Sequence, residues 1–122
     1  MKQTAFSVKR VDFGSADIRT NRDIEYEAFS QVTSLLQRAE RTLVFKDRIE
    51  GVSRNNSLWT ALIIDLAHER NKLASEVRAS LLSLGVFCIR YGCRGMSGGI
   101  SLEPLIDINW RMMKGLRGDF SS

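Results

Sequence analysis

Leu105-Ile106-Asp107-Ile108-Asn109 decides the fold, because its apolar residues follow the spacing of one helix face and an asparagine lies on that face. The stretch Asn55-Asn56-Ser57-Leu58-Trp59, near the middle of the chain, has the same character, with Asn56 on the apolar stripe. A leucine would pack better at either asparagine. Such polar positions are typical of amphipathic helices that pack in a defined register, and they are no sign of catalytic chemistry.

The composition is that of an ordinary globular protein. The 122 residues fit one domain whose core needs neither a metal ion nor a disulfide. The chain is 43% hydrophobic and 26% charged and contains one proline, which favours long uninterrupted helices. No segment has the apolar length of a membrane span, and the first residues do not resemble a secretion signal. We therefore expect a cytoplasmic protein with no membrane partner.

The apolar periodicity predicts an all-α fold, a single-domain bundle of about four helices. An irregular N-terminal arm is expected over residues 1–19, and the helical domain over residues 20–122. The predicted helices span about residues 20–45, 47–67, 74–94 and 101–118. Thr20 is expected to cap the first helix and Ser101 the fourth, where Pro104 is acceptable because it falls in the first turn.

The boundary between the first two helices depends on a cap. Asp47 and Glu50 have the spacing of a capping box, which predicts that the second helix begins there. Gly51 weakens the helix just after this point. The third helix carries apolar residues on most of its sides, so we expect it to be the central and most enclosed helix of the bundle.

The polar residues within the apolar stripes have two interpretations. Asn56 and Asn109 are either contacts to a partner or residues that hydrogen-bond across the bundle and define the register of its helices; the structural interpretation is favoured. We expect Trp59 in the core, with its indole N–H donating to a carbonyl. Asp65 and Asp107 are expected to cap or pair at the surface, where a salt bridge contributes little.

One cluster could support metal-dependent chemistry. Asp65, His68 and Glu69 share a helix face, and two carboxylates with an imidazole could hold a metal. His68 is the only histidine of the chain, and Arg70 and Lys72 follow it. A solvated surface patch is therefore the favoured interpretation, and we expect neither a metal site nor a cofactor.

Other reactive patterns are weak. Cys88 and Cys93 lie about 140° apart round one predicted helix, so they are not placed to pair or to share a metal. We expect both to be reduced and mostly buried. The glycines between residues 95 and 99 lack the lysine and the strand of a phosphate-binding loop. The sequence therefore predicts that the protein is not an enzyme.

Several stretches together resemble one protein family. They are Glu25-Tyr26 after a capped helix start, Asn56-x-x-Trp59 followed by Asp65, residues 73–78 opening a helix, and residues 105–109 followed by Gly115-Leu116. In order and spacing these stretches resemble the FlaF family of flagellar biosynthesis regulators, over about residues 20–116. The chain departs from the family pattern where Asn21 and Ala74 replace frequent prolines, and where Trp110 replaces a small polar or basic residue.

The resemblance implies a cytoplasmic protein that binds flagellin, promotes its synthesis and acts as its export chaperone. A companion repressor of flagellin translation, which the family opposes, is a further expected partner. The expected partner contact lies near the carboxyl end, where apolar side chains gather, at Trp110, Met112, Met113 and Phe120. In the alternative interpretation the two methionines fill gaps in the core.

RNA is the alternative partner. The formal net charge is +4 and the pI is about 9.4. Basic residues gather between Arg38 and Arg54, namely Arg38, Arg41, Lys46, Arg48 and Arg54. Acidic residues interrupt them, as on an ordinary solvated helix surface. A post-transcriptional regulator of flagellin translation would use this basic surface to bind RNA, and its affinity would fall steeply with salt.

Overall fold

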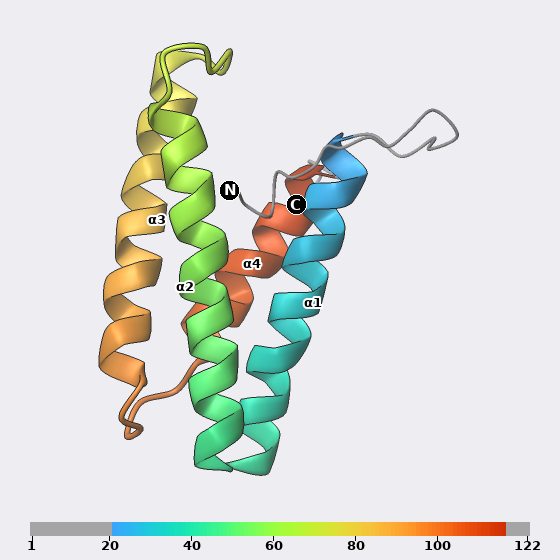
Figure 1. Cartoon of the computed structure of the whole chain (residues 1–122), viewed down its shortest axis with the longest axis vertical. Coiled ribbons are helices and arrows are strands. Elements are labelled where there is room, and N and C mark those ends of the chain that lie inside the picture. Colours follow the sequence, from blue (N-terminus) through green and yellow to red (C-terminus); the bar gives the residue numbers. More distant parts are fainter. Residues whose placement is uncertain (1–20, 117–122) are drawn as a thin grey trace.

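The computed structural model describes the backbone of residues 21–116 and the side chains of residues 25–116, which form four helices (Figure 1). These are α1 (Asn21–Thr42), α2 (Phe45–Ala67), α3 (Ser75–Gly95) and α4 (Glu103–Leu116). No strand occurs within the described part of the chain. The predicted all-α bundle is thus confirmed, while the arm predicted over residues 1–19 lies outside the described residues.

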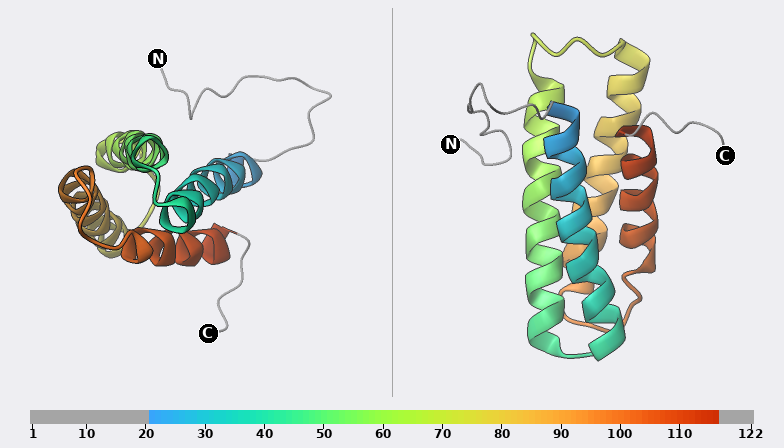
Figure 2. Two further views of the ribbon diagram at one scale, coloured as in Figure 1. Left: turned by 90° about the horizontal axis from the view of Figure 1, so that it is seen from below. Right: turned by 90° about the vertical axis from the view of Figure 1, so that its right-hand side faces the viewer.

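Helix α2 is the centre of the bundle. It packs against α1 on one side and against α3 on another, while α4 packs along α1. The two views in Figure 2 show α4 beside α1 and α3 beside α2. Helix α3 makes only a small contact with α4 and none with α1. Helix α3 therefore lies at the edge of the bundle, with α2 as its one close neighbour among the described helices.

The prediction that the third helix is the most enclosed one is wrong. The buried residues of α3 are small, namely Gly85, Cys88, Gly92 and Gly95. They form a narrow stripe against α2, and the larger apolar side chains flank this stripe and stay partly exposed. Apolar residues on most sides of a helix do not enclose it when only one neighbouring helix packs closely against it.

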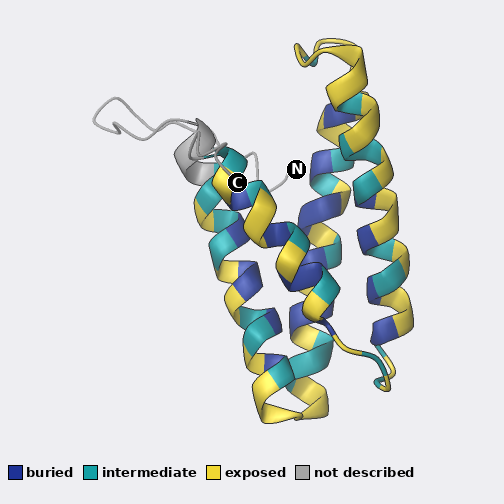
Figure 3. Ribbon diagram, turned by 180° about the vertical axis from the view of Figure 1, so that it is seen from behind, coloured by how far each residue is buried: buried dark blue, intermediate teal, exposed yellow. Residues whose placement is uncertain are grey.

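The core lies mainly between α1, α2 and α4, as the buried positions in Figure 3 indicate. Phe29 of α1 and Trp59 of α2 are its largest buried side chains, and their rings meet edge to face with centroids 5.6 Å apart. The other buried apolar side chains are Val32, Leu36, Ala39, Val52, Leu58, Leu62, Leu66, Cys88, Leu102, Leu105, Ile106 and Met113. Their helical spacing is what brings the four segments together.

The corner between α1 and α2 differs from the predicted one. Leu43 has a φ of 60°, which ends α1, and the extended residue Val44 precedes α2. The predicted capping box is therefore wrong, because Asp47 already lies within the first turn of α2. Its carboxylate accepts a hydrogen bond from the Thr42 hydroxyl at 2.8 Å and pairs with Arg38 at 3.5 Å. Because the chain reverses direction at the single left-handed residue Leu43, α2 begins at Phe45, two residues before the predicted start.

The connection between α3 and α4 is tied to the first two helices by polar contacts. The Arg48 guanidinium donates to the carbonyl oxygens of Gly95 and Ile100 and lies 4.0 Å from the Glu40 carboxylate. Glu40 in turn accepts a hydrogen bond from the Leu102 N–H at 2.8 Å. At the start of α4 the Ser101 hydroxyl oxygen accepts the Glu103 N–H at 3.0 Å, which fits its predicted capping role.

Candidate binding surfaces

A buried chain of polar side chains joins α2 to α4. The Trp59 indole N–H donates to the Asn109 amide oxygen at 3.0 Å, and the Asn109 amide nitrogen donates to the Asn55 amide oxygen at 2.8 Å. All three residues are fully buried. Asn109 therefore bonds across the bundle, and Trp59 lies in the core with its N–H bonded to an amide carbonyl. Buried hydrogen bonds of this kind define how α2 and α4 are aligned along their lengths, and they leave no polar group of Asn109 available to a ligand.

Asn55 is the residue that the sequence analysis missed. The predicted apolar stripe included Asn56 instead of the adjacent Asn55. Adjacent side chains of a helix point about 100° apart, so the two asparagines face different neighbours. Asn56 instead faces α3, where its amide nitrogen lies 3.8 Å from the Cys93 sulfur. Its amide oxygen is buried with no hydrogen-bond partner, and a Cβ added at Gly92 would lie 2.5 Å from that oxygen. Gly92 is thus what lets α3 approach α2 so closely.

The three predicted partner contacts that the structure describes differ in burial. Trp110 is exposed, with 43% of its surface accessible. Met113 is buried with its sulfur 4.0 Å from the Thr33 hydroxyl, so its assignment to the partner surface is wrong, and the core-filling alternative holds. Met112 is partly buried against the core. Phe120 lies outside the described residues.

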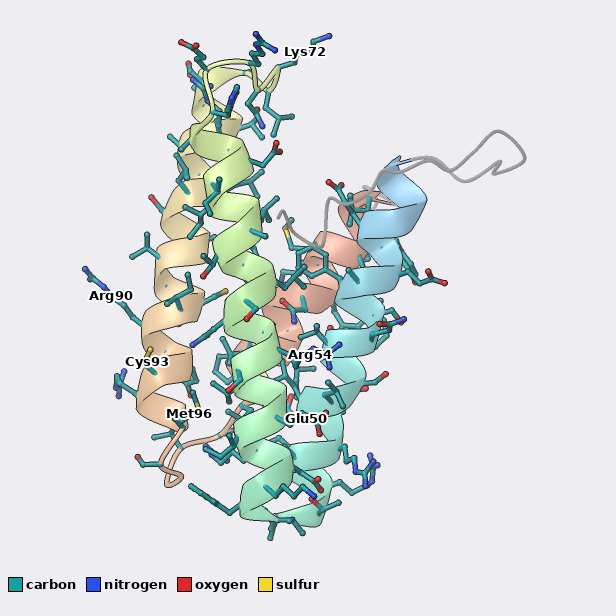
Figure 4. All side chains as sticks on the ribbon, viewed as in Figure 1. Glu50, Arg54, Lys72, Arg90, Cys93 and Met96 are labelled. Carbon is teal, nitrogen blue, oxygen red and sulfur yellow. The ribbon has the colours of Figure 1, made fainter. Side chains whose placement is uncertain are left out.

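The predicted basic surface is broken up in the fold. Arg48 is mostly buried and engaged in the contacts to the α3–α4 connection, so it does not belong to an open cationic patch. Arg38 pairs with Asp47. Arg54 is exposed on α2, where Figure 4 also shows the acidic Glu50. Mixed charges of this kind weaken the case for an RNA-binding surface.

The residues considered for metal chemistry make local contacts. Asp65 accepts hydrogen bonds from the Asn71 amide through its carbonyl and its carboxylate, and His68 Nδ1 accepts the Arg70 N–H at 3.0 Å. Within residues 21–116 no group of three or more His, Cys, Asp or Glu side chains could hold a metal ion. Asp107 pairs with Arg111 at 3.3 Å on the exposed side of α4. These are ordinary surface interactions.

The two cysteines differ in their surroundings. Burial of Cys88 raises the pKa of its thiol from 9.0 to about 12, because the thiolate would lose its hydration. Cys93 is exposed, so the expectation that both cysteines are mostly buried is wrong for this one. Figure 4 labels Cys93 on α3, one turn from Arg90. Both thiols are free.

The comparison with protein families decides the classification. The family model described as "Flagellar protein FlaF" matches residues 13–116. The chain belongs to the FlaF family. Neither a curated protein nor a solved structure matches it. In this FlaF-family chain, none of the helices within the described residues is both long enough and apolar enough to cross a membrane.

Helix α3 of this FlaF-family chain exposes large apolar side chains on a side that no described helix packs against. Val86 and Phe87 are exposed on this side, and Val77 is exposed on a different face near the start of the helix. The Phe87 ring stacks on Tyr91 with centroids 5.6 Å apart, and the Tyr91 hydroxyl donates to the Ser101 carbonyl at 2.6 Å. Phe87 is thus held by an aromatic neighbour that is itself anchored. The outer side of α3 is the best-formed candidate for a protein contact in the described part of the chain.

Proposed function

We propose that this FlaF-family protein binds flagellin in the cytoplasm, promotes its synthesis and acts as its export chaperone, without enzymatic activity. Membership of a family of flagellar proteins supports a role in flagellum biogenesis. The observation that carries the finer proposal is the outer side of α3, which exposes the consecutive residues Val86 and Phe87 although the helix belongs to a well-packed bundle. Exposed apolar clusters of this kind mark contacts with other proteins.

The proposed contact is helix against helix. Unassembled flagellin exposes terminal helices with apolar stripes, and such a helix can lie along α3 with its stripe against Phe87. The stacked Phe87–Tyr91 pair offers a rigid aromatic anchor, which costs little conformational entropy on binding. Covering this surface and the flagellin stripe at the same time would keep both proteins from aggregating. A companion translation repressor is a further partner consistent with this role.

Calorimetric titration of the full chain with flagellin tests the proposal. Phe87→Glu places a charge in the proposed contact and should weaken binding at least about tenfold, since burying an unpaired charge is costly. Trp110→Glu, at a similarly exposed aromatic on α4, is the matched variant that separates the α3 contact from the contact expected at the carboxyl end. Absence of flagellin binding by the unaltered protein would refute the proposal.

Salt dependence distinguishes flagellin from RNA. An apolar contact with flagellin should weaken little as salt is raised, whereas an RNA contact through cations such as Arg41 and Arg54 should weaken steeply. Arg48 is not a useful probe here, because its removal would disturb the α3–α4 connection. Strong salt-sensitive retention of flagellin messenger, with no affinity for flagellin, would favour the RNA-binding regulator instead.

A further inference from the structure

The turn between α1 and α2 exposes three consecutive large apolar residues, Leu43, Val44 and Phe45. Their accessible fractions are 82%, 48% and 62%. We call these three residues the apolar corner. Figure 1 shows it at the opposite end of the bundle from the α2–α3 connection, whose residues 68–72 are polar. Three adjacent large apolar residues are thus exposed at this turn, whereas the other connection exposes the single large apolar residue Leu73.

The apolar corner is not explained by the needs of the turn. Leu43 has a φ of 60°, a conformation that glycine or asparagine adopts with less strain than leucine. Polar side chains at Val44 and Phe45 would also cost the fold little, because neither side chain is buried. A strained backbone carrying exposed apolar side chains is a combination that points to a contact outside the chain.

The apolar corner is held rigid by polar contacts at its base. Asp47 accepts from the Thr42 hydroxyl, and the same hydroxyl oxygen accepts the Val44 N–H at 3.2 Å. The Leu43 N–H donates to the Ala39 carbonyl at 3.1 Å. The backbone N–H groups of Leu43 and Val44 are therefore already hydrogen-bonded. Removing water from the apolar corner would leave neither of them without a partner.

Cations surround the apolar corner. Arg41 and Lys46 are exposed within one turn of it on either side. The neighbouring carboxylates are balanced by other arginines, since Asp47 pairs with Arg38 at 3.5 Å and Glu40 lies 4.0 Å from Arg48. Arg41 and Lys46 are then the cations nearest the apolar corner, and a pair of adjacent cations favours an anionic partner.

We propose that the apolar corner inserts into the interfacial region of an anionic lipid bilayer, with Arg41 and Lys46 on the phosphate groups. The apolar corner consists of three consecutive residues, whereas a stable protein interface takes about 20–30 residues from each partner. A peripheral membrane contact needs only a few apolar side chains and adjacent cations. A peripheral contact does not require a membrane-spanning segment. The lack of such a segment in the sequence, which underlies the expectation of no membrane partner, therefore does not argue against it.

Co-sedimentation of the full chain with vesicles tests this inference. The vesicles contain either phosphatidylcholine alone or equal parts of phosphatidylcholine and phosphatidylglycerol. Binding should occur with the mixed vesicles and fall as salt is raised. The double variant Leu43→Gly with Phe45→Ser should bind at least about tenfold more weakly, because it removes two of the inserting side chains. Leu43→Gly suits the backbone conformation, so loss of binding would not result from unfolding.

The matched control is Ile64→Ser, which removes an exposed apolar side chain from α2 outside the apolar corner and should leave vesicle binding unchanged. Absence of binding to the mixed vesicles, or equal binding by the double variant, would overturn the inference. Loss of flagellin binding in the double variant, with no vesicle binding by the unaltered protein, would assign the apolar corner to a protein partner. Vesicle binding and flagellin binding are measured separately, so one can fail without the other.

Discussion

Replacing Asn109 by leucine should destabilise the bundle although it makes the core more apolar. The substitution leaves the Trp59 indole N–H and the Asn55 amide oxygen without the partners that they now have at 3.0 and 2.8 Å. Each orphaned buried group costs about 1–3 kcal/mol, and the added apolar burial returns about 1–2 kcal/mol. We expect the free energy of unfolding to fall by about 2–3 kcal/mol.

Asn55→Leu is the comparison that isolates the hydrogen-bond argument. The Asn55 amide nitrogen is buried and has no partner, so this substitution removes one unsatisfied group while orphaning only the Asn109 amide nitrogen. It should therefore cost less than Asn109→Leu, about 1 kcal/mol or below. Both residues are fully buried on facing helices, which makes the two variants comparable in packing.

Urea unfolding of the full chain, followed by far-ultraviolet circular dichroism, measures both differences. The order of the two variants is more informative than either value, because leucine packing contributes to both. If Asn109→Leu were neutral, or if Asn55→Leu were the more damaging substitution, Asn109 would not be the central member of a hydrogen-bonded chain, and the structural explanation of these asparagines would be refuted.

Four further substitutions or measurements test the structure. Leu43→Gly should raise the free energy of unfolding by about 1 kcal/mol in a calorimetric melt, because glycine adopts a φ of 60° without strain; a loss of stability would contradict this. Gly92→Ala should lower it by about 1–3 kcal/mol in urea, because the new Cβ would lie 2.5 Å from the Asn56 amide oxygen, and an unchanged midpoint would speak against such close packing. Burial raises the pKa of Cys88 above its unfolded value of 9.0 to about 12, so the folded state binds more protons in that interval. The Cys88 contribution to stability should be complete below pH 9 and lost as pH rises toward 12, a slope that Cys88→Ala should remove. A maleimide should also modify Cys93 much faster than Cys88.

The tertiary structure changed the functional interpretation of several residues. The sequence predicts Met113 as a partner contact because apolar side chains gather near the carboxyl end. In the structure Met113 is buried in the core, with its sulfur 4.0 Å from the Thr33 hydroxyl. Arg48 looked like part of a basic surface, yet its guanidinium holds the α3–α4 connection. Charge and hydropathy alone cannot tell an exposed residue from one that meets a partner distant in sequence.

Apolar periodicity and capping residues such as Ser101 are enough to predict four helices, because both act over a few neighbouring positions. The resemblance to the FlaF family rests instead on the order and spacing of several short stretches. Only the tertiary structure decided that Asn55 rather than Asn56 joins the buried chain, and that α3 lies at the edge of the bundle. The physical reason is that a 100° rotation per residue leaves two adjacent positions almost equally consistent with one apolar stripe. Which of them is buried depends on where the other helices pack, and that arrangement is a property of the whole chain.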